Sequence, residues 1–153
     1  MYPSVSSDTA YKIIDKEGDR RYELANHLGN VLAVISDRKT GIANGNAPNY
    51  TSFEAITISA TDYFPFGMSM PGRSWTSPNT EGYRYGFQGI ENSDLTGDYT
   101  TFYREYSSRV ANWLSTDTKA SEDPEYSPYS VMGNNPILYT DKQGDMIYLG
   151  LTI

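Results

Sequence analysis

The sequence of 153 residues contains no cysteine and only one histidine, His27. Without cysteine the chain has no disulfide and no thiolate zinc site, and one histidine gives little basis for a histidine metal site. We therefore predict no metal site and no other cofactor. His27 lies in the polar segment 26–30, where we expect its ring to brace a turn rather than to act in catalysis.

Long apolar runs and clusters of positive charge are also absent. No apolar run approaches the roughly 20 residues that span a bilayer, and the first ten residues, MYPSVSSDTA, have neither the charged nor the apolar part of a signal peptide. The net charge is −7, from 12 Lys and Arg against 19 Asp and Glu. Because no apolar run is long enough to span a bilayer, we predict no membrane insertion. Because phosphate binding depends on clustered Lys and Arg, which are scattered here, we also predict no nucleic-acid partner.

Aromatic and turn-forming residues are abundant instead. The chain has 14 Tyr, 5 Phe and 2 Trp, with 13 Gly and 8 Pro spread along it. This combination favours many short strands and tight turns over long helices. We therefore predict an all-β fold, in which antiparallel hairpins lead into an irregular part rich in Pro and Gly, with few or no long helices.

The densest aromatic stretch, Tyr83–Asp117, organises the rest of the chain. Tyr83, Tyr85 and Phe87 alternate, which places their rings on one face of an extended segment. Thr100–Tyr106 is predicted as a further strand. A helix is the alternative, because a second set of residues follows helical spacing: Tyr103, Tyr106, Val110, Trp113 and Leu114. The β-preferring residues before Ser107 favour the strand.

Strand patterns also flank this stretch. Arg20–Ala25 and Val31–Ser36 predict a hairpin whose second strand is apolar, and so buried, on both faces. Ser52–Ala60 alternates as a third strand. Met68–Asn79 is predicted as a loop, in which Trp75 could bind sugar or peptide. Shorter strands are expected at 11–15, 129–132, 137–139 and 146–153.

Several segments together resemble the RHS repeat-associated core, the C-terminal part of RHS/YD-repeat proteins that include polymorphic toxins. The matching residues are YRYGFQG at 83–89, Arg104, Tyr106, Arg109, WLSTD at 113–117, SPYS at 127–130 and GNNPI at 133–137. Upstream, NHLGNVLAVISD at 26–37 resembles a YD-type repeat, and DYFPFGMSMPGRSW at 62–75 resembles the linker of Bacteroidetes-like versions. The resemblance favours strands over a helix in the central stretch.

The resemblance implies four consecutive regions. They are a YD-repeat-like hairpin segment at 1–60, a Pro/Gly/aromatic linker at 61–82, the RHS-associated core at 83–147 and the start of a variable C-terminal region at 148–153. Eight residues are predicted to build or brace the core: Tyr85, Phe87, Arg104, Tyr106, Trp113, Leu114, Tyr129 and Pro136. Trp113 and Leu114 are expected to be buried and central to stability.

The resemblance also implies a candidate catalytic pair, Asp117 and Asp141. In RHS cores two such aspartates form an autoprotease that releases the C-terminal segment. That chemistry requires two carboxylates near enough to share one proton, so that one acid is neutral while the other activates water. Cleavage would then fall near Gly144, Asp145 and Met146.

The sequence departs from the family pattern beside both acids. Thr118 and Lys142 stand where the family has proline, so the turns that hold the carboxylates are less rigid.

The interpretation that follows is a structural core of a secreted or cell-surface bacterial RHS protein, which encloses or presents a C-terminal effector. Its expected partners are that effector and the rest of the RHS/YD-repeat shell. The alternatives are an active aspartyl autoprotease and a carbohydrate- or peptide-binding surface module.

Overall fold

The computed structural model describes residues 18, 20–43, 50–78, 80–93 and 96–150, and this part of the chain is all-β. Ten strands and two short 3-10 turns follow one another, which confirms the predicted fold class. The elements are β1 (Arg21–Ala25), β2 (Val31–Ala43), β3 (Tyr50–Tyr63), β4 (Ser69–Thr76), η1 (Phe87–Gly89), β5 (Glu91–Asn92), β6 (Tyr99–Thr100), β7 (Glu105–Ser107), β8 (Asn112–Trp113), η2 (Met132–Asn134), β9 (Tyr139–Thr140) and β10 (Tyr148–Leu149). No helix in the described residues is long and apolar enough to cross a membrane.

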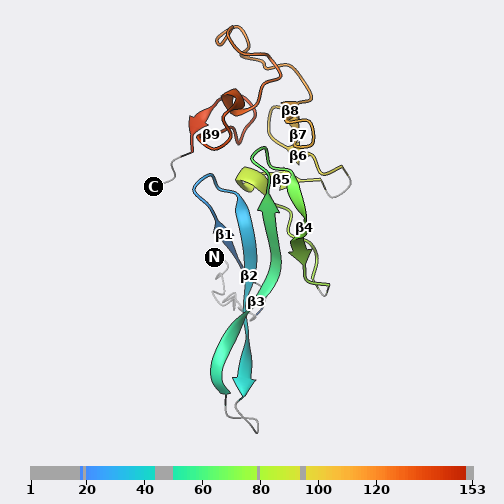
Figure 1. Ribbon diagram of the computed structural model, residues 1–153, viewed down its shortest axis with the longest axis vertical. Helices are drawn as coiled ribbons and strands as arrows, with labels where there is room; N and C mark the ends of the chain where they lie inside the picture. The colour runs from blue at the N-terminus through green and yellow to red at the C-terminus, as the bar shows by residue number, and fades with distance from the viewer. Residues whose placement is uncertain (1–17, 19, 44–49, 79, 94–95, 151–153) are drawn as a thin grey trace, which may run out of the picture.

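The first sheet has the antiparallel order β1-β2-β3-β4. Its β1–β2 hairpin is the one predicted from the sequence, with Arg21 opposite Ser36. β2 and β3 run on together beyond β1 as a long two-stranded ribbon, which gives the molecule its elongated shape (Figure 1). The prediction that β2 is buried on both faces holds only in part. Val31 and Val34 are buried, but Leu32 is exposed, because it is the extra residue at a register shift in the pairing with β1.

The predicted loop at 68–79 is instead largely an edge strand, β4, paired with β3. Pro71 and Gly72 suggested a loop, but an edge strand tolerates proline because one of its sides needs no N–H donor. The register shifts between Thr61 and Tyr63, next to the turn at 64–67 that joins the two strands. Gly67 closes that turn with a φ of +83°, a conformation that favours glycine.

The second sheet, β5-β6-β7-β8, lies in the stretch for which a strand and a helix competed, and the strand prediction is confirmed. The single strand expected over 100–106 is, however, two strands that reverse direction. The reversal is built by Thr101, whose Oγ1 donates to the Arg104 carbonyl at 2.6 Å and accepts from the Arg104 amide at 3.1 Å. This local side-chain bonding competes with a continuous strand.

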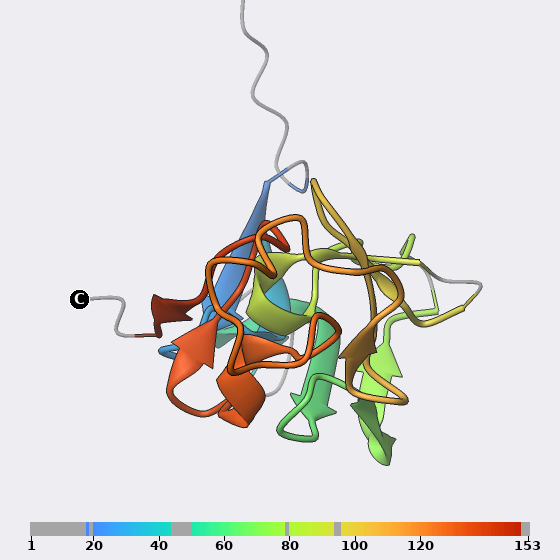
Figure 2. The ribbon, with the colours of Figure 1, turned by 90° about the horizontal axis from the view of Figure 1, so that it is seen from above.

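The main core is a cluster of rings and aliphatic side chains between the second sheet and the two 3-10 turns. Its buried members are Phe87, Ile90, Tyr99, Tyr106, Trp113, Val131 and Met132. The rings of Tyr99 and Tyr106 stack with centroids 6.1 Å apart, and Tyr106 meets Trp113 at 5.4 Å. Seen from above, η1 lies between the C-terminal strands and the strands of the second sheet (Figure 2). A smaller cluster of Val31, Val34 and Ile58 lies on the first sheet.

The predicted core is correct in part. Phe87, Arg104, Tyr106, Trp113 and Pro136 are buried. Three others are exposed: Tyr85 (41%), Leu114 (57%) and Tyr129 (44%). Leu114 follows Trp113 at a strand end, and successive side chains of a strand point to opposite faces, so burying the indole exposes the leucine.

Two further expectations fail because the chain turns instead of extending. Tyr85 and Phe87 do not share a face, since η1 begins at Phe87 and Gln88 adopts a φ of +55°. In the C-terminal part, residues 129–131 lie in a turn and an irregular stretch and Met132 begins η2, where an extended piece was expected at 129–132. Only 139–140 and 148–149 pair as strands, while the strand expected at 11–15 lies outside the described residues.

Candidate functional site

Arg104 is the centre of the candidate site, and its side chain is only 2% exposed. The turn built by Thr101 places it between β6 and β7. Its guanidinium carbon lies 4.4 Å from the centre of the Trp113 ring, a cation–π contact. Nε donates to the carbonyl of Gly144, and Nη1 donates to the carbonyl of Pro128 at 3.4 Å. One buried cation therefore joins segments that are far apart in the sequence.

The structure brings the two predicted aspartates to this cation. Asp117 Oδ2 lies 2.7 Å from Arg104 Nη2, and Asp141 Oδ2 lies 3.4 Å from the same nitrogen. The Asp141 side chain is 3% exposed and that of Asp117 is 22% exposed. The two acids thus share one cation, whereas the catalytic pair expected from the resemblance would share a proton.

Asp141 builds its own turn in the absence of the expected proline. Its Oδ1 accepts from the amides of Gly144 at 2.8 Å and Asp145 at 3.1 Å. Gly144 has a φ of +81°, and a Cβ built there would lie 2.4 Å from Thr101 Oγ1, so glycine is required by both conformation and space. Asp117 organises its turn similarly, since its Oδ1 accepts from the Lys119 amide at 2.7 Å.

Gln88 connects the aspartate turn to the first hairpin, a role that the sequence did not reveal. The buried backbone N–H of Gln88 donates to Asn30 Oδ1 at 2.8 Å. The Gln88 side-chain Oε1 accepts from the backbone N–H of Asp141 at 3.0 Å. Nε2 contacts the Sδ of Met132 at 2.7 Å. The only hint in the sequence was the position of Gln88 inside YRYGFQG. Its partners are 58, 53 and 44 positions away along the chain.

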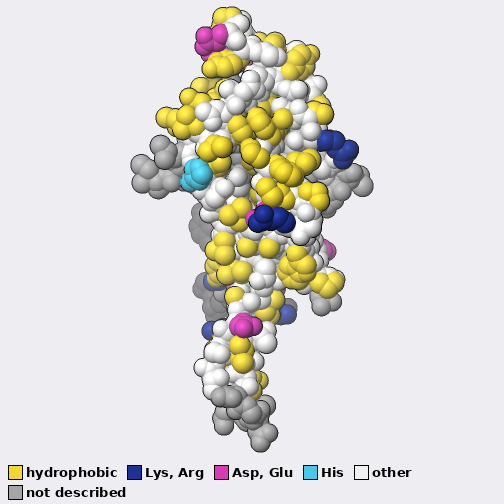
Figure 3. Space-filling model, in the orientation of Figure 1, with side chains coloured by type: hydrophobic (Ala, Val, Ile, Leu, Met, Phe, Trp, Pro, Cys, Tyr) yellow, Lys and Arg dark blue, Asp and Glu magenta, His cyan; other side chains and the backbone are white. Residues whose placement is uncertain are grey.

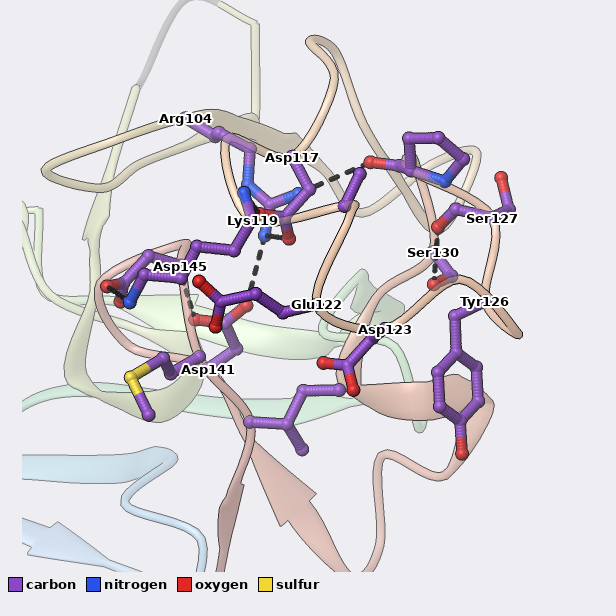
Figure 4. A pocket seen from close by; sticks show the side chains of 14 residues that line it. Arg104, Asp117, Lys119, Glu122, Asp123, Tyr126, Ser127, Ser130, Asp141 and Asp145 are labelled. Carbon is purple, nitrogen blue, oxygen red and sulfur yellow. Dashed lines mark hydrogen bonds and ion pairs between the residues drawn. The ribbon is translucent and has the colours of Figure 1, made fainter.

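A pocket of about 160 Å³ opens beside this cluster (Figure 4). It is lined by Arg104, Asp117, Lys119, Asp141 and Asp145, together with Met146 and residues of the loop at 120–130. Lys119 Nζ lies 2.9 Å from Asp145 Oδ2. Asp145 Oδ1 is buried and has no hydrogen-bond partner in the described part of the chain. Two residues of the predicted cleavage region, Asp145 and Met146, thus line the pocket that holds both acids.

Two ionisable groups that line the pocket have shifted pKa values. Burial raises the pKa of Asp141 above its ordinary value, although the Gly144 amide and Arg104 oppose this change. The hydrogen bond to Asp145 raises the pKa of Lys119, so the lysine stays charged. The pocket therefore combines an acid that holds its proton more tightly than usual with two fixed cations.

Other candidate residues lie elsewhere. His27 is exposed in the turn between β1 and β2 and does not line the pocket. Trp75 is half exposed on the edge strand β4. Within the described residues no group of three or more His, Asp or Glu side chains is placed to hold a metal ion.

No protein-family model matches the sequence, and no curated protein sequence matches it. Solved structures do match. A crystal structure of TcdB2-TccC3-Cdc42 aligns over 82% of this chain with a TM-score of 0.63 and 25% identity. The chain has an RHS-type fold. A crystal structure of TcdB2-TccC3-TEV aligns over 81% with a TM-score of 0.59 and 23% identity. A structure of the Photorhabdus luminescens Tc holotoxin pore, with a mutation in TccC3, aligns over 86% with a TM-score of 0.55 and 22% identity.

The matched region is a small part of each Tc toxin chain. This protein corresponds to 5% of the chain in the two crystal structures and to 6% in the holotoxin pore. More than four-fifths of this chain aligns in each case, so the likeness extends over most of the sequence.

Proposed function

We propose that this chain is the structural core of a secreted RHS-type toxin component and that it holds the start of a C-terminal effector segment. The observation that carries the proposal is the buried Arg104. Its guanidinium binds Asp117, Asp141 and the Gly144 carbonyl, so the chain is fixed at the point where the segment after Gly144 departs. Hydrogen bonds to charged groups that are shielded from water are among the stronger polar contacts in proteins.

The surface supports a role as one part of a larger shell. Apolar side chains cover much of the upper body on the face shown in Figure 3, where charged groups are sparse. Large exposed apolar residues include Phe102 (84%), Ile137 (67%) and Leu149 (60%). Extensive exposed apolar surface marks sites where another protein part packs. The partners proposed here are the rest of an RHS/YD-repeat shell and its effector, in keeping with the small share of the Tc toxin chains that this protein matches.

A second candidate function, an aspartyl autoprotease, is favoured by one observation. Asp117 and Asp141 face the pocket that Asp145 and Met146 also line, and the raised pKa of Asp141 suits the acid that stays neutral in such a pair. Arg104 argues against efficient catalysis. The charge of Arg104 opposes the raised pKa of Asp141, whereas the mechanism needs one neutral acid.

The two functions are distinguished by following the intact mass of the chain with a folded tag fused after Ile153. A structural core keeps the tag attached over a day at neutral pH, in the parent and in Asp117→Asn and Asp141→Asn alike. Release from the parent, but from neither variant, would establish the autoprotease. Arg73→Met, which alters an exposed ion pair with Asp62, serves as the control for nonspecific proteolysis.

A further inference from the structure

The β2–β3 ribbon extends beyond the rest of the first sheet and leaves one long strand edge open (Figure 1). β4 pairs with β3 between Ser59 and Tyr63, and the Ser77 amide continues this pairing by donating to the Ile58 carbonyl at 2.8 Å. Within the described residues, no strand pairs with the outer edge of β3 at 50–57. An open strand edge presents backbone donors and acceptors to which another strand can bind.

The two edges of the ribbon differ in charge. The part of β2 that runs beyond β1, DRKTGIA at 37–43, has three charged residues and a glycine. The open part of β3, YTSFEAIT at 50–57, has Glu54 as its one charged residue and contains neither proline nor glycine. Charged residues on an edge oppose the addition of a strand, whereas a β-preferring segment with little charge favours it. The β3 edge is therefore the one suited to pairing.

One face of the ribbon beside this edge carries exposed rings. Phe53 is opposite Gly41 in the β2–β3 pairing, and the ring of Tyr50 lies over the same glycine. The Tyr50 and Phe53 ring centroids are 5.9 Å apart, and Lys39 Nζ lies 5.3 Å from the centre of the Phe53 ring. Tyr50 is 54% exposed and Phe53 is 59% exposed. Apolar rings next to an open strand edge indicate a surface for contact with another protein strand.

We propose that the open edge of β3 pairs, antiparallel, with the same edge of a second copy of this chain, with Phe53 opposite Phe53 of the second copy. The resulting sheet has four strands, whereas a two-stranded ribbon alone is only marginally stable in water. Because the paired strands run in opposite directions and each ribbon extends away from its own body, the two bodies lie at opposite ends of the joint sheet. The contact is two-fold and closed, so it forms a dimer rather than a fibre.

Charge decides the register of this pairing. Within 50–57 the overlap is longest, about seven residues, when the two-fold axis passes through Phe53 or Glu54. An axis through Glu54 would place two carboxylates directly opposite each other, and like charges in that position are destabilising. An axis through Phe53 places the two rings opposite each other, which is a favourable cross-strand pair, and places each Glu54 opposite a Ser52 hydroxyl. The edge is thus complementary to itself in one of the two registers.

The oligomeric state of the full chain is the first test. An overlap of about 24 Å, from seven residues at ~3.4 Å each, is small for a protein interface, so we expect a Kd on the order of 100 µM. Sedimentation velocity from about 10 µM to about 1 mM should show a reversible monomer–dimer equilibrium centred near that value. A chain that is monomeric over the whole range would overturn the proposal, as would assemblies that grow beyond a dimer.

Single cysteines test the register, since the chain itself contains none. In Phe53→Cys the two introduced thiols are directly opposite, with Cα atoms about 4.5–5.5 Å apart, which suits a disulfide. Mild oxidation should therefore give a covalent dimer. Ala55→Cys, also exposed and on the same face, is the matched control. Its two thiols are offset by four positions, about 14 Å, and should not link. Equal linkage in both variants, or none in Phe53→Cys, would overturn the proposed pairing.

Opposite charges at Ser52 provide a test that keeps the rings intact. Ser52→Lys places a cation opposite each Glu54 and should lower the Kd about fivefold, while Ser52→Glu places like charges there and should raise it about fivefold. Ser52 is exposed, so neither change endangers the fold. An equal Kd in both variants, or shifts of the same sign, would contradict the register. These positions lie on the ribbon and not in the pocket around Arg104, so the results are independent of the proposed core.

Discussion

Replacing Arg104 by methionine tests whether one buried guanidinium holds the core together. Methionine keeps an unbranched apolar stem against Trp113 but leaves Asp117, Asp141 and the Gly144 carbonyl without their cation. Removing one partner of a buried ion pair costs about 3–5 kcal/mol, because the remaining charge is left unpaired. With the Arg104 side chain only 2% exposed, solvent screens little of this loss.

The assay is urea denaturation at pH 7 of the parent, Arg104→Met and Arg73→Met. Arg73 pairs with Asp62 at the same 2.7 Å that separates Arg104 from Asp117, but its side chain is 67% exposed. Exposed pairs contribute about 0–1 kcal/mol, so Arg73→Met should change the free energy of unfolding little. The loss in Arg104→Met should shrink on acidification, because burial raises the pKa of Asp141 and lets that carboxyl take up a proton. Equal, small losses in both variants would refute the reasoning.

Three further predictions follow from burial and hydrogen bonding. Trp113→Ala should lower the free energy of unfolding by about 3–5 kcal/mol, whereas Leu114→Ala, at an exposed position, should cost below about 1 kcal/mol; equal losses would show that the core is misplaced. The pKa of Asp141 is raised, so the folded protein binds the proton of this carboxyl more tightly than the unfolded chain does. The free energy of unfolding of the parent, relative to that of Asp141→Asn, should therefore fall as the pH rises above about 4. A difference between the two proteins that does not depend on pH would contradict this. Gln88→Met leaves the buried backbone N–H of Asp141 without its acceptor, which should lower the free energy of unfolding by about 1–3 kcal/mol and speed hydrogen exchange at that N–H. Unchanged exchange would show that Gln88 does not hold Asp141.

The sequence predicted what depends on local pattern. The alternation in 20–36 and the polar turn inside it are sufficient for the β1–β2 hairpin, and the β-preferring residues before Ser107 indicated strands. β4 was missed because Pro71 and Gly72 are turn residues in isolation, and only pairing with β3 makes that segment a strand. The exposure of Leu114 depends on which of two adjacent apolar residues faces the core, which composition does not decide.

The candidate site shows the same division between local and long-range information. Asp117 and Asp141 were found through their resemblance to a family motif, and each closes its own turn through local hydrogen bonds. Arg104 was predicted as a core residue without its polar partners, which lie from Asp117 to Gly144 and so up to 40 positions away along the chain. Gln88 was missed because its hydrogen bonds to Asn30 and Asp141 span more than 50 positions each. Such contacts follow from the fold and are not visible in residue order.

The most direct test of the proposed core is peptide-resolved hydrogen exchange of the parent and Arg104→Met. The amides of Gly144 and Asp145 bind Asp141, and the Tyr103 amide binds the Gln143 carbonyl, so the parent should protect peptides that cover these residues. In Arg104→Met this protection should be lost while peptides of the β2–β3 ribbon keep theirs. If the peptides around Gly144 exchange as slowly in the variant as in the parent, Arg104 does not hold the departing segment and the account is wrong.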